Sequence, residues 1–348
     1  MIPKKFRAFR IHSDKDGHRA GVEQTSLDEL SAGEVVIKTV YSSVNYKDAL
    51  AGSGKGRILR EPTLIGGIDV AGHVVESSDK AFKKGDAVLC TGCGLSETRD
   101  GGYSEYARLP AKWAVPLPKG LSLRESMVIG TAGFTAALSL YRMLQNDQKP
   151  EHGPIVVTGA TGGVGMLAID ILTRAGFEAH AITGKSDQFD FLIGLGAKQC
   201  ISRTDLHWGQ RPLETARWAG AIDNVGGDML AGLTRVIQPF GNIAICGNAA
   251  SIELATTVMP MILRGVSLLG ISSANTSSAI RSEIWKRLAS DWKPAHLDRI
   301  QTKDVGLDEL PEVFDAMTAG DSFGRTLVTI SGEKPASAGQ RHQKKRRA

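Results

Sequence analysis

Two hydrophobic patterns follow each other along this chain of 348 residues. Up to residue 125, short apolar runs rich in β-branched residues alternate with Gly, Pro and Asp, a pattern typical of a β-rich domain. Strands are predicted there at 6–11, 34–40, 72–75, 87–91 and 103–109. From residue 126 onward, apolar runs of strand length alternate with amphipathic helices. This alternation predicts a parallel sheet whose strands are joined by crossover helices.

The second region begins with a long predicted helix at 126–144. Predicted strands follow at 155–159, 178–183, 199–201, 219–223, 241–246 and 267–272, and predicted helices at 162–175, 187–195, 228–237 and 277–290. A final apolar run at 324–329 has no neighbouring strand in sequence, so we expect it to return to the first domain. The pattern therefore predicts an α/β protein with a β-rich domain over residues 1–125 and a parallel-sheet domain that begins at residue 126. A basic tail at 331–348 is expected to be disordered.

A glycine-rich turn in the second region has the form of a phosphate-binding loop. The apolar strand that ends at Thr158 is followed by Gly159, Gly162 and Gly165, and then by an amphipathic helix. In a doubly wound fold, this order aims the backbone N–H groups of a helix N-terminus at a dinucleotide pyrophosphate. Because the spacing is G-x-x-G-x-x-G rather than the commoner G-x-G-x-x-G, a turn that serves packing alone stays an alternative.

The end of the next strand indicates which dinucleotide binds. Sites for NAD usually place Asp or Glu there, to hold the ribose 2′-hydroxyl. This chain instead has Thr183-Gly184-Lys185, and Arg203 follows the third strand. Because a cation, a hydroxyl group and free N–H groups attract a 2′-phosphate that a carboxylate would repel, we expect NADP(H). The alternative is an ordinary surface loop in which Asp187 compensates the lysine.

Charge and cysteine content exclude some other classes of protein. The net charge of +5 resides in residues 331–348, where six basic residues stand against one acid, so the rest of the chain is neutral and indicates no nucleic-acid surface. Four cysteines in so long a chain give no disulfide framework. No leader is visible and no apolar run approaches the ~20 residues of a membrane helix, so we expect a cytoplasmic protein with no membrane partner.

Several motifs extend over most of the chain. They are 45–50 (NYKDAL), 67–72 (GIDVAG), 129–136 (IGTAGFTA), 218–223 (WAGAID) and 256–266 (TTVMPMILRGV), together with the glycine turn. In these motifs the chain resembles the medium-chain dehydrogenase/reductase superfamily, and within it the zinc-free, quinone-oxidoreductase-like branch, most of all the acryloyl-CoA reductases. The resemblance implies a GroES-like β-rich catalytic domain at 1–125 and 261–330, and a Rossmann domain with a doubly wound parallel sheet for the cofactor at 126–260.

The same resemblance implies a set of cofactor contacts. They are Tyr46, Thr161, Gly162, Gly163, Val164, Thr183, Gly184, Lys185, Arg203, Asn248, Ile262 and Ser273. Two positions depart from the family's usual residues. Lys185 replaces an arginine, which keeps the charge and loses the bidentate fork. Cys93 replaces a tryptophan in the loop after the strand at 87–91, which changes the expected shape of the substrate pocket.

The sequence predicts no metal site. Zinc dehydrogenases of this superfamily need a Cys and a His-Glu pair at positions where this chain has Asn45 and Ile68-Asp69. Neither Asn nor Ile offers the donor atom that catalytic zinc takes. Cys90 and Cys93 form a lone C-x-x-C pair, and two ligands cannot complete a tetrahedral site.

Without zinc, reduction of an activated C=C bond is the chemistry that is easiest to explain. The sequence predicts NADPH-dependent reduction of a short 2-enoyl-CoA, with acryloyl-CoA to propanoyl-CoA as the specific hypothesis. Tyr46 is the candidate catalytic residue, as a proton donor or an oxyanion hydrogen bond, with packing against the nicotinamide as an equal alternative. Asp48 and Asp69 are interpreted as hydrogen-bonding residues. An NADPH:quinone or general enone reductase and a non-catalytic NADPH-binding protein remain alternative functions, because fold does not decide among them.

Two features concern the binding partners. The basic residues Lys47, Lys55, Arg57 and Arg60 could meet the phosphates of a CoA-thioester substrate, or they could be solvated charges. The apolar run at 266–271 is expected to end the cofactor-domain sheet. Pairing of this edge across a two-fold axis predicts a homodimer.

Overall fold

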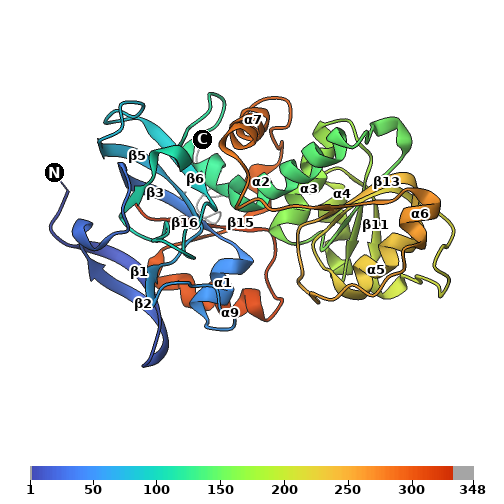
Figure 1. Cartoon of the computed structure of the whole chain (residues 1–348), viewed down its shortest axis with the longest axis horizontal. Helices are drawn as coiled ribbons and strands as arrows, with labels where there is room; N and C mark the ends of the chain where they lie inside the picture. Colours follow the sequence, from blue (N-terminus) through green and yellow to red (C-terminus); the bar gives the residue numbers. More distant parts are fainter. Residues whose placement is uncertain (1, 332–348) are drawn as a thin grey trace, which may run out of the picture.

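The computed structural model describes residues 2–331, and Figure 1 shows two lobes with the long helix α2 between them. The strands are β1 (Phe6–Asp14), β2 (Gly17–Thr25), β3 (Val35–Val44), β4 (Thr63–Ile65), β5 (Asp69–Ser77), β6 (Ala87–Thr91), β7 (Tyr106–Leu109), β8 (Val115–Pro116), β9 (Ile155–Thr158), β10 (Ala179–Thr183), β11 (Ala197–Ser202), β12 (Trp218–Asp223), β13 (Ile237–Ile245), β14 (Ser267–Gly270), β15 (Gln301–Val305) and β16 (Arg325–Thr329). The helices are α1 (Tyr46–Gly52), α2 (Leu123–Gln145), α3 (Gly163–Arg174), α4 (Phe189–Ile193), α5 (Gly227–Val236), α6 (Met259–Arg264), α7 (Ser278–Leu288), α8 (Leu297–Ile300) and α9 (Leu310–Thr318).

The β-rich lobe is built from both ends of the chain. A small antiparallel sheet has the order β2-β1-β4, and a larger sheet has the order β15-β16-β3-β5-β6-β8, with β7 also paired to β3. β16 runs antiparallel to β3, which confirms that the last apolar run returns to the first region of the chain. Aromatic side chains fill the core beneath α1 and α9, where Phe9 contacts both Tyr103 and Phe314 edge to face.

The second lobe contains a six-stranded parallel sheet with the order β11-β10-β9-β12-β13-β14. Its central strands β9 and β12 are buried along their whole length, as the near-continuous apolar runs of a doubly wound sheet require. The strand order reverses between β9 and β12, and doubly wound sheets bind ligands outside the carboxyl ends of their strands at such a point. The glycine turn follows β9, so the fold puts it at this position.

α2 is the longest helix of the described residues, and it is broken near its N-terminal end. At Gly130 the backbone leaves the helical region, with φ 48° and ψ −157°, and the helix resumes at Thr131. By length and composition alone α2 could cross a membrane, yet 78% of its most apolar stretch is buried inside the protein. The sequence predicted this helix at 126–144, and the structure shows that its apolar residues belong to the core.

The chain after residue 260 contributes to both lobes. β14 pairs in parallel with β13, and α7 and α8 pack on the helices beside the parallel sheet, where Trp285 and Trp292 join its core. Only β15 and β16 belong to the β-rich lobe. The predicted domain boundary at 260 therefore falls before β14, whereas the chain changes lobes before β15. The predicted tail, apart from Ser331, lies outside the described residues.

Candidate functional site

Residues of both lobes line a cleft with a volume of about 630 Å³. They belong to the segments 44–47, 68, 92–95, 131–135, 159–165, 224–225, 246–249, 273–274 and 317–325. The parallel-sheet lobe contributes strand ends and turns, and the β-rich lobe contributes the start of α1 and a loop from the C-terminal region. Two walls of different construction therefore face this cleft.

The first wall is the glycine turn between β9 and α3. Gly159 has a left-handed φ of 58°, and Gly162 is the N-cap of α3, so the first N–H groups of that helix face the cleft. A β-carbon on Gly165 would lie 2.4 Å from the carbonyl oxygen of Gly159, so only glycine allows the helix to start this close to the strand. The turn thus presents backbone donors with no side chain in front of them, as binding of a pyrophosphate requires.

At the end of β10, two cations lie beside a hydroxyl group. Thr183 Oγ1 is 3.1 Å from Thr161 Oγ1 and accepts the backbone N–H of Lys185 at 3.1 Å, which links this strand end to the glycine turn. Arg203 packs on Gly184, where an added β-carbon would lie 2.6 Å from its Nε. Asp187 accepts a hydrogen bond from its neighbour Gln188 rather than from the lysine.

Lys185 also makes a contact that sequence reasoning missed. Its Nζ donates a 2.7 Å hydrogen bond to the carbonyl oxygen of Ser322, in the loop before β16. Two residues further on, the N–H of Gly324 donates to Thr161 O at 3.0 Å. The loop from the β-rich lobe is therefore attached to the first wall at two points. No sequence pattern around a lysine predicts a hydrogen-bond acceptor that lies 137 residues further along the chain.

The second wall contains Tyr46, the first residue of α1. Its side chain lines the cleft, and the residue is 44% exposed. The preceding residue, Asn45, is 9% exposed, and its backbone N–H donates to Asp48 Oδ2 at 2.9 Å, which closes the first turn of α1. The tyrosine is thus held at the surface of the cleft by a buried polar turn behind it.

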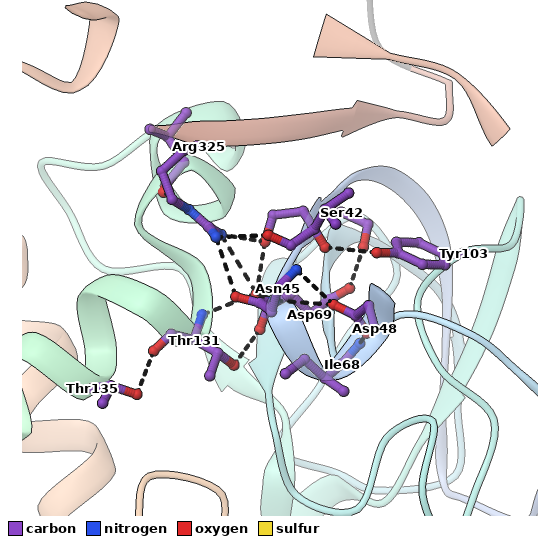
Figure 2. Close-up of polar contacts among 12 residues, drawn as sticks. Ser42, Asn45, Asp48, Ile68, Asp69, Tyr103, Thr131, Thr135 and Arg325 are labelled. Carbon is purple, nitrogen blue, oxygen red and sulfur yellow. Dashed lines mark hydrogen bonds and ion pairs between the residues drawn. The ribbon is translucent and has the colours of Figure 1, made fainter. Parts of the chain in front are cut away.

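A buried carboxylate organises this wall, as Figure 2 shows. Asp69 is fully buried, and its two oxygens accept hydrogen bonds from Ser43 Oγ at 2.6 Å and Asn45 Nδ2 at 2.8 Å. They also accept the N–H of Thr131 at 2.9 Å and its hydroxyl at 2.6 Å. Thr131 is the residue at which α2 resumes, so the carboxylate lies at the positive end of a helix segment.

The cation of this network comes from the other end of the chain. Arg325, 3% exposed, has its Nη2 3.9 Å from Asp69 Oδ2. Its remaining hydrogen bonds go to Val128 O (2.9 Å), Val44 O (2.8 Å), Asn45 Oδ1 (3.2 Å) and Ser43 Oγ (2.7 Å). Sequence reasoning did not select Arg325. A buried charge at this position is satisfied because five groups from three separate segments surround it.

Gly130 makes room for this network. A β-carbon at that position would lie 2.6 Å from Asp69 Oδ2 and 2.7 Å from Arg325 Nη2. Its positive φ also strains any residue other than glycine. The break in α2 and the ion pair therefore depend on the same residue.

Asp48 is a second buried carboxyl group in the same wall. Burial, with the charge of Asp69 adding, raises the pKa of Asp48 to about 7, although the N–H groups of Asn45 and Ile68 that donate to it act in the opposite direction. Tyr103 lies nearby and donates to the carbonyl oxygen of Ser43 at 3.1 Å. Both aspartates are thus hydrogen-bonding residues behind the wall, as interpreted from the sequence.

The structure brings most of the predicted cofactor contacts together. Those that line the cleft are Tyr46, Gly162, Gly163, Val164, Asn248 and Ser273. Thr161, Thr183, Gly184, Lys185 and Arg203 are connected to them through the contacts at the end of β10. Ile262 differs, because it lies on α6, is 69% exposed and is not among the residues that line the cleft.

The positions of the zinc ligands in related enzymes hold a different arrangement here. Asn45 and Asp69 hydrogen-bond each other, and the guanidinium group of Arg325 contacts both. Within residues 2–331, His, Cys, Asp and Glu form no group of three that could hold a metal ion. The side-chain oxygen atoms of Asn45 and Asp69, which are the atoms at this site that could bind a metal ion, are in contact with the fixed cation of Arg325.

Comparison with known proteins identifies the family. The model of the alcohol dehydrogenase GroES-like domain matches residues 31–119, and that of the zinc-binding dehydrogenase matches residues 163–290. The Bacillus subtilis protein YhfP, which carries a provisional quinone-oxidoreductase name, is 45% identical over 93% of this chain and 99% of its own length. The chain belongs to the medium-chain dehydrogenase/reductase superfamily. The acrylyl-CoA reductase AcuI of Ruegeria pomeroyi is 40% identical over 94% of this chain and 99% of its own length.

Solved structures of this superfamily share the fold. The yhdH oxidoreductase of Salmonella enterica, in complex with NADP, has a TM-score of 0.89 and 41% identity, covering 93% of this chain and 100% of its own. The yhfP protein of Bacillus subtilis, with NAD bound, has a TM-score of 0.91 and 44% identity, covering 94% of this chain and 100% of its own. The GroES-like and Rossmann domains expected from the sequence are confirmed.

Proposed function

We propose that this medium-chain oxidoreductase reduces the C=C bond of a short 2-enoyl-CoA with NADPH, and that acryloyl-CoA, giving propanoyl-CoA, is its substrate. The observation that carries the proposal is the cleft itself, in which Tyr46 is exposed on one wall and the donor-rich glycine turn on the other. Two relatives of 40% and 42% identity are named as acrylyl-CoA reductases, which supports the substrate class.

The cofactor fits the first wall by its chemistry. The backbone N–H groups at the start of α3 would hold the pyrophosphate, and Lys185 and Arg203 would hold the 2′-phosphate. Bound NADPH supplies a hydride for the β-carbon of the substrate. The hydrogen bond to the carbonyl oxygen of Ser322 uses one of the three N–H donors of Lys185 Nζ, so the others would be available for a phosphate.

The second wall would act on the carbonyl end of the substrate. Hydride addition at the β-carbon moves negative charge onto the thioester oxygen, and the α-carbon then takes a proton. The Tyr46 hydroxyl is the candidate hydrogen-bond donor to that oxygen, because its side chain is in the cleft while the buried turn behind it fixes its backbone. The network of Asp69 and Arg325 would keep this turn rigid without touching the substrate.

Basic side chains near the start of α1 support a CoA thioester. Lys47 lines the cleft and pairs with Glu97, and Lys55 Nζ donates to Thr318 Oγ1, another residue that lines the cleft, at 2.7 Å. Arg57 and Arg60 follow in the same exposed loop. Four cations against two carboxylates, Glu97 and Glu61, would attract the phosphates of CoA to this side of the cleft.

A second candidate function is the reduction of quinones or simple enones by NADPH. The observation that favours it is the similarity to YhfP, whose identity of 45% exceeds that to the named acrylyl-CoA reductases. The same two walls would serve it, because a quinone also gains negative charge on oxygen when it accepts hydride.

NADPH oxidation with acryloyl-CoA, crotonyl-CoA and 1,4-benzoquinone, measured side by side, separates the two functions. The proposal expects the highest kcat/KM with acryloyl-CoA and a loss of activity when CoA is replaced by a short thiol without phosphates. Faster turnover of the quinone than of either CoA ester would contradict it.

We also propose a homodimer formed through β14. In the described sheet β14 is an edge strand, and α6 next to it exposes Ile262 (69%) and Leu263 (59%), with Phe240 nearby in β13 at 81%. Pairing of two edges would cover this apolar surface. Light scattering at micromolar concentration tests the proposal, and a monomeric mass would count against it.

A further inference from the structure

Two cysteines lie at a sharp turn at the edge of the cleft. Cys90 is in β6 and fully buried, whereas Cys93 follows it in the turn and is 8% exposed. Gly92, Cys93 and Gly94 all have left-handed backbones, with φ of 69°, 53° and 79°. This turn reverses the chain and places the two thiols close enough for each to shift the pKa of the other. Gly92 and Gly94 themselves line the cleft.

A buried arginine lies beside this turn without an anionic partner. Arg281 of α7 is 3% exposed. Its guanidinium group donates only to neutral oxygens, namely Thr91 O (2.8 Å), Thr91 Oγ1 (3.1 Å), Ser273 O (2.9 Å) and Ala274 O (3.4 Å). It also lies 4.7 Å from the ring centre of Phe134. Within residues 2–331 no carboxylate forms an ion pair with it, although buried charges are almost always paired.

The thiol of Cys93 can supply the missing negative charge. The hydrogen bond from Cys90 lowers the pKa of Cys93, and the guanidinium groups of Arg281 and Arg99 lower it further, against the effect of burial. The same hydrogen bond, burial and the charge of Asp69 raise the pKa of Cys90. The two thiols therefore have different roles, because a thiolate is the nucleophile in disulfide exchange and a buried thiol is its resolving partner.

We propose that Cys93 and Cys90 form a reversible dithiol–disulfide site in the wall of the cleft, which reacts with small disulfides. The Cys93 thiolate attacks one sulfur of the disulfide, forms a mixed disulfide and releases one thiolate. Cys90 then loses its proton and attacks Cys93 Sγ, which closes the Cys90–Cys93 bond and releases the second thiolate. The protein gives up two electrons and two thiol protons, and the small disulfide becomes two thiols.

Oxidation at this site would change the cleft. The Cys93 charge opposite Arg281 would be lost, and Arg281 is the group that holds the carbonyl oxygens of Ser273 and Ala274. The backbone N–H of Cys93 also donates to Ala274 O at 3.3 Å, so the turn and this segment move together. We expect a several-fold loss of NADPH-dependent turnover, which dithiothreitol reverses. Of the whole proposal, only this expected loss of turnover rests on the proposed function.

Mass spectrometry tests the site without any activity measurement. The reduced, folded protein is incubated with oxidised glutathione, then denatured, alkylated and digested with trypsin, so that both cysteines lie in the peptide between Lys84 and Arg99. The expected peptide is lighter by two hydrogen atoms than the reduced peptide and carries no alkyl group. A peptide that is alkylated at both cysteines after this treatment would overturn the proposal.

Three variants assign the two roles. Cys90→Ser should stop at the mixed disulfide and carry glutathione on Cys93, and Cys93→Ser should leave Cys90 unmodified. Cys200→Ser is the matched control, because Cys200 is half-buried in β11 away from the turn, and it should form the Cys90–Cys93 disulfide at the parent rate. Glutathione on Cys90 in the Cys93→Ser variant, at the rate seen on Cys93, would contradict the assignment.

Discussion

The two walls of the cleft differ in how the chain builds them. The wall around α3 uses the turns that follow neighbouring strands of one sheet, and its binding groups are backbone N–H donors and partly exposed cations. The wall around Tyr46 draws Ser43, Asp69, Thr131 and Arg325 from four distant segments and buries their charges completely or almost completely. One wall is ready to bind a ligand, whereas the other has its polar groups satisfied internally and serves to hold one tyrosine in place.

This difference predicts that substitutions in the two walls have different effects. Removal of a group from the buried network should lower the stability of the whole protein, because an unpaired charge remains in the core. Removal of a group from the cofactor wall should lower binding and leave folding almost unchanged. The four predictions below test this contrast, in order of decreasing effect.

The largest effect is expected from Arg325→Met. The substitution keeps an unbranched apolar stem and leaves Asp69 buried without its cation, so the free energy of unfolding should fall by roughly 3–5 kcal/mol. Urea unfolding followed by circular dichroism measures it. Arg211→Met is the control, because its ion pair with Glu214 is at the surface, and it should change stability by less than ~1 kcal/mol. Equal losses of unfolding free energy in Arg325→Met and Arg211→Met would refute the special role of the buried network in stability.

The next effect is a pH dependence that Asp48 imposes. Its pKa is about 7 in the folded protein, against an ordinary value of 3.8. Between these values the folded state keeps a proton that the unfolded state has lost, so stability should fall as the pH rises through this range. Asp48→Asn cannot ionise, and its stability should depend less on pH there. Unfolding of both proteins across that range is the measurement, and parallel pH profiles would exclude Asp48 as the cause.

A smaller effect, confined to turnover, is expected from Tyr46→Phe. A hydrogen bond that strengthens in the transition state acts on kcat, so kcat for acryloyl-CoA should fall by ~10²-fold. NADPH affinity and the free energy of unfolding should stay close to those of the parent, because the residue is 44% exposed and the turn behind it is intact. Full retention of kcat would mean that Tyr46 only packs against the nicotinamide and that the proton comes from water.

The smallest effect is expected from Lys185→Ala. Loss of a charge-assisted contact that contributes roughly 1.5–3 kcal/mol should weaken NADPH binding about tenfold or more and leave NADH binding almost unchanged. Lys185→Arg should retain NADPH affinity. Titration of nicotinamide fluorescence gives both affinities. A relative of 44% identity was crystallised with NAD, so both cofactors have to be tested. Equal losses of NADPH and NADH affinity in Lys185→Ala would show that this lysine does not select NADP(H).

The sequence allowed prediction of the wall that is local in the chain. The strand predicted at 155–159 ends one residue earlier, at Thr158, and the strand predicted at 178–183 ends at Thr183, because buried strands and glycine turns have strong local patterns. The strands β2, β4, β8 and β15 were not predicted. β2 is mostly polar and exposed and β4 has three residues, so neither has a clear apolar alternation.

The buried network could not be predicted from the sequence. Asp69 was recognised as a hydrogen-bonding residue, but its partners Ser43, Thr131 and Arg325 are brought together only by the pairing of β16 with β3 and by the break in α2. The edge strand was predicted better, because the apolar run at 266–271 was expected to end the cofactor-domain sheet and β14 lies at that edge.

The position of Arg325 also limits how this cleft could acquire metal-dependent chemistry. Replacement of Asn45 by Cys and of Ile68 by His would restore two ligand types of the zinc dehydrogenases, but the guanidinium group already lies 3.2 Å from Asn45 Oδ1 and 3.9 Å from Asp69 Oδ2. A divalent ion there would meet a fixed positive charge. Interconversion of the zinc-free and zinc-dependent enzyme types therefore requires simultaneous substitutions at positions 45 and 68 and at Arg325. The intermediate in which Arg325 alone is replaced is the least stable one, because Asp69 stays buried without its cation. An evolutionary path of single substitutions between them is correspondingly narrow.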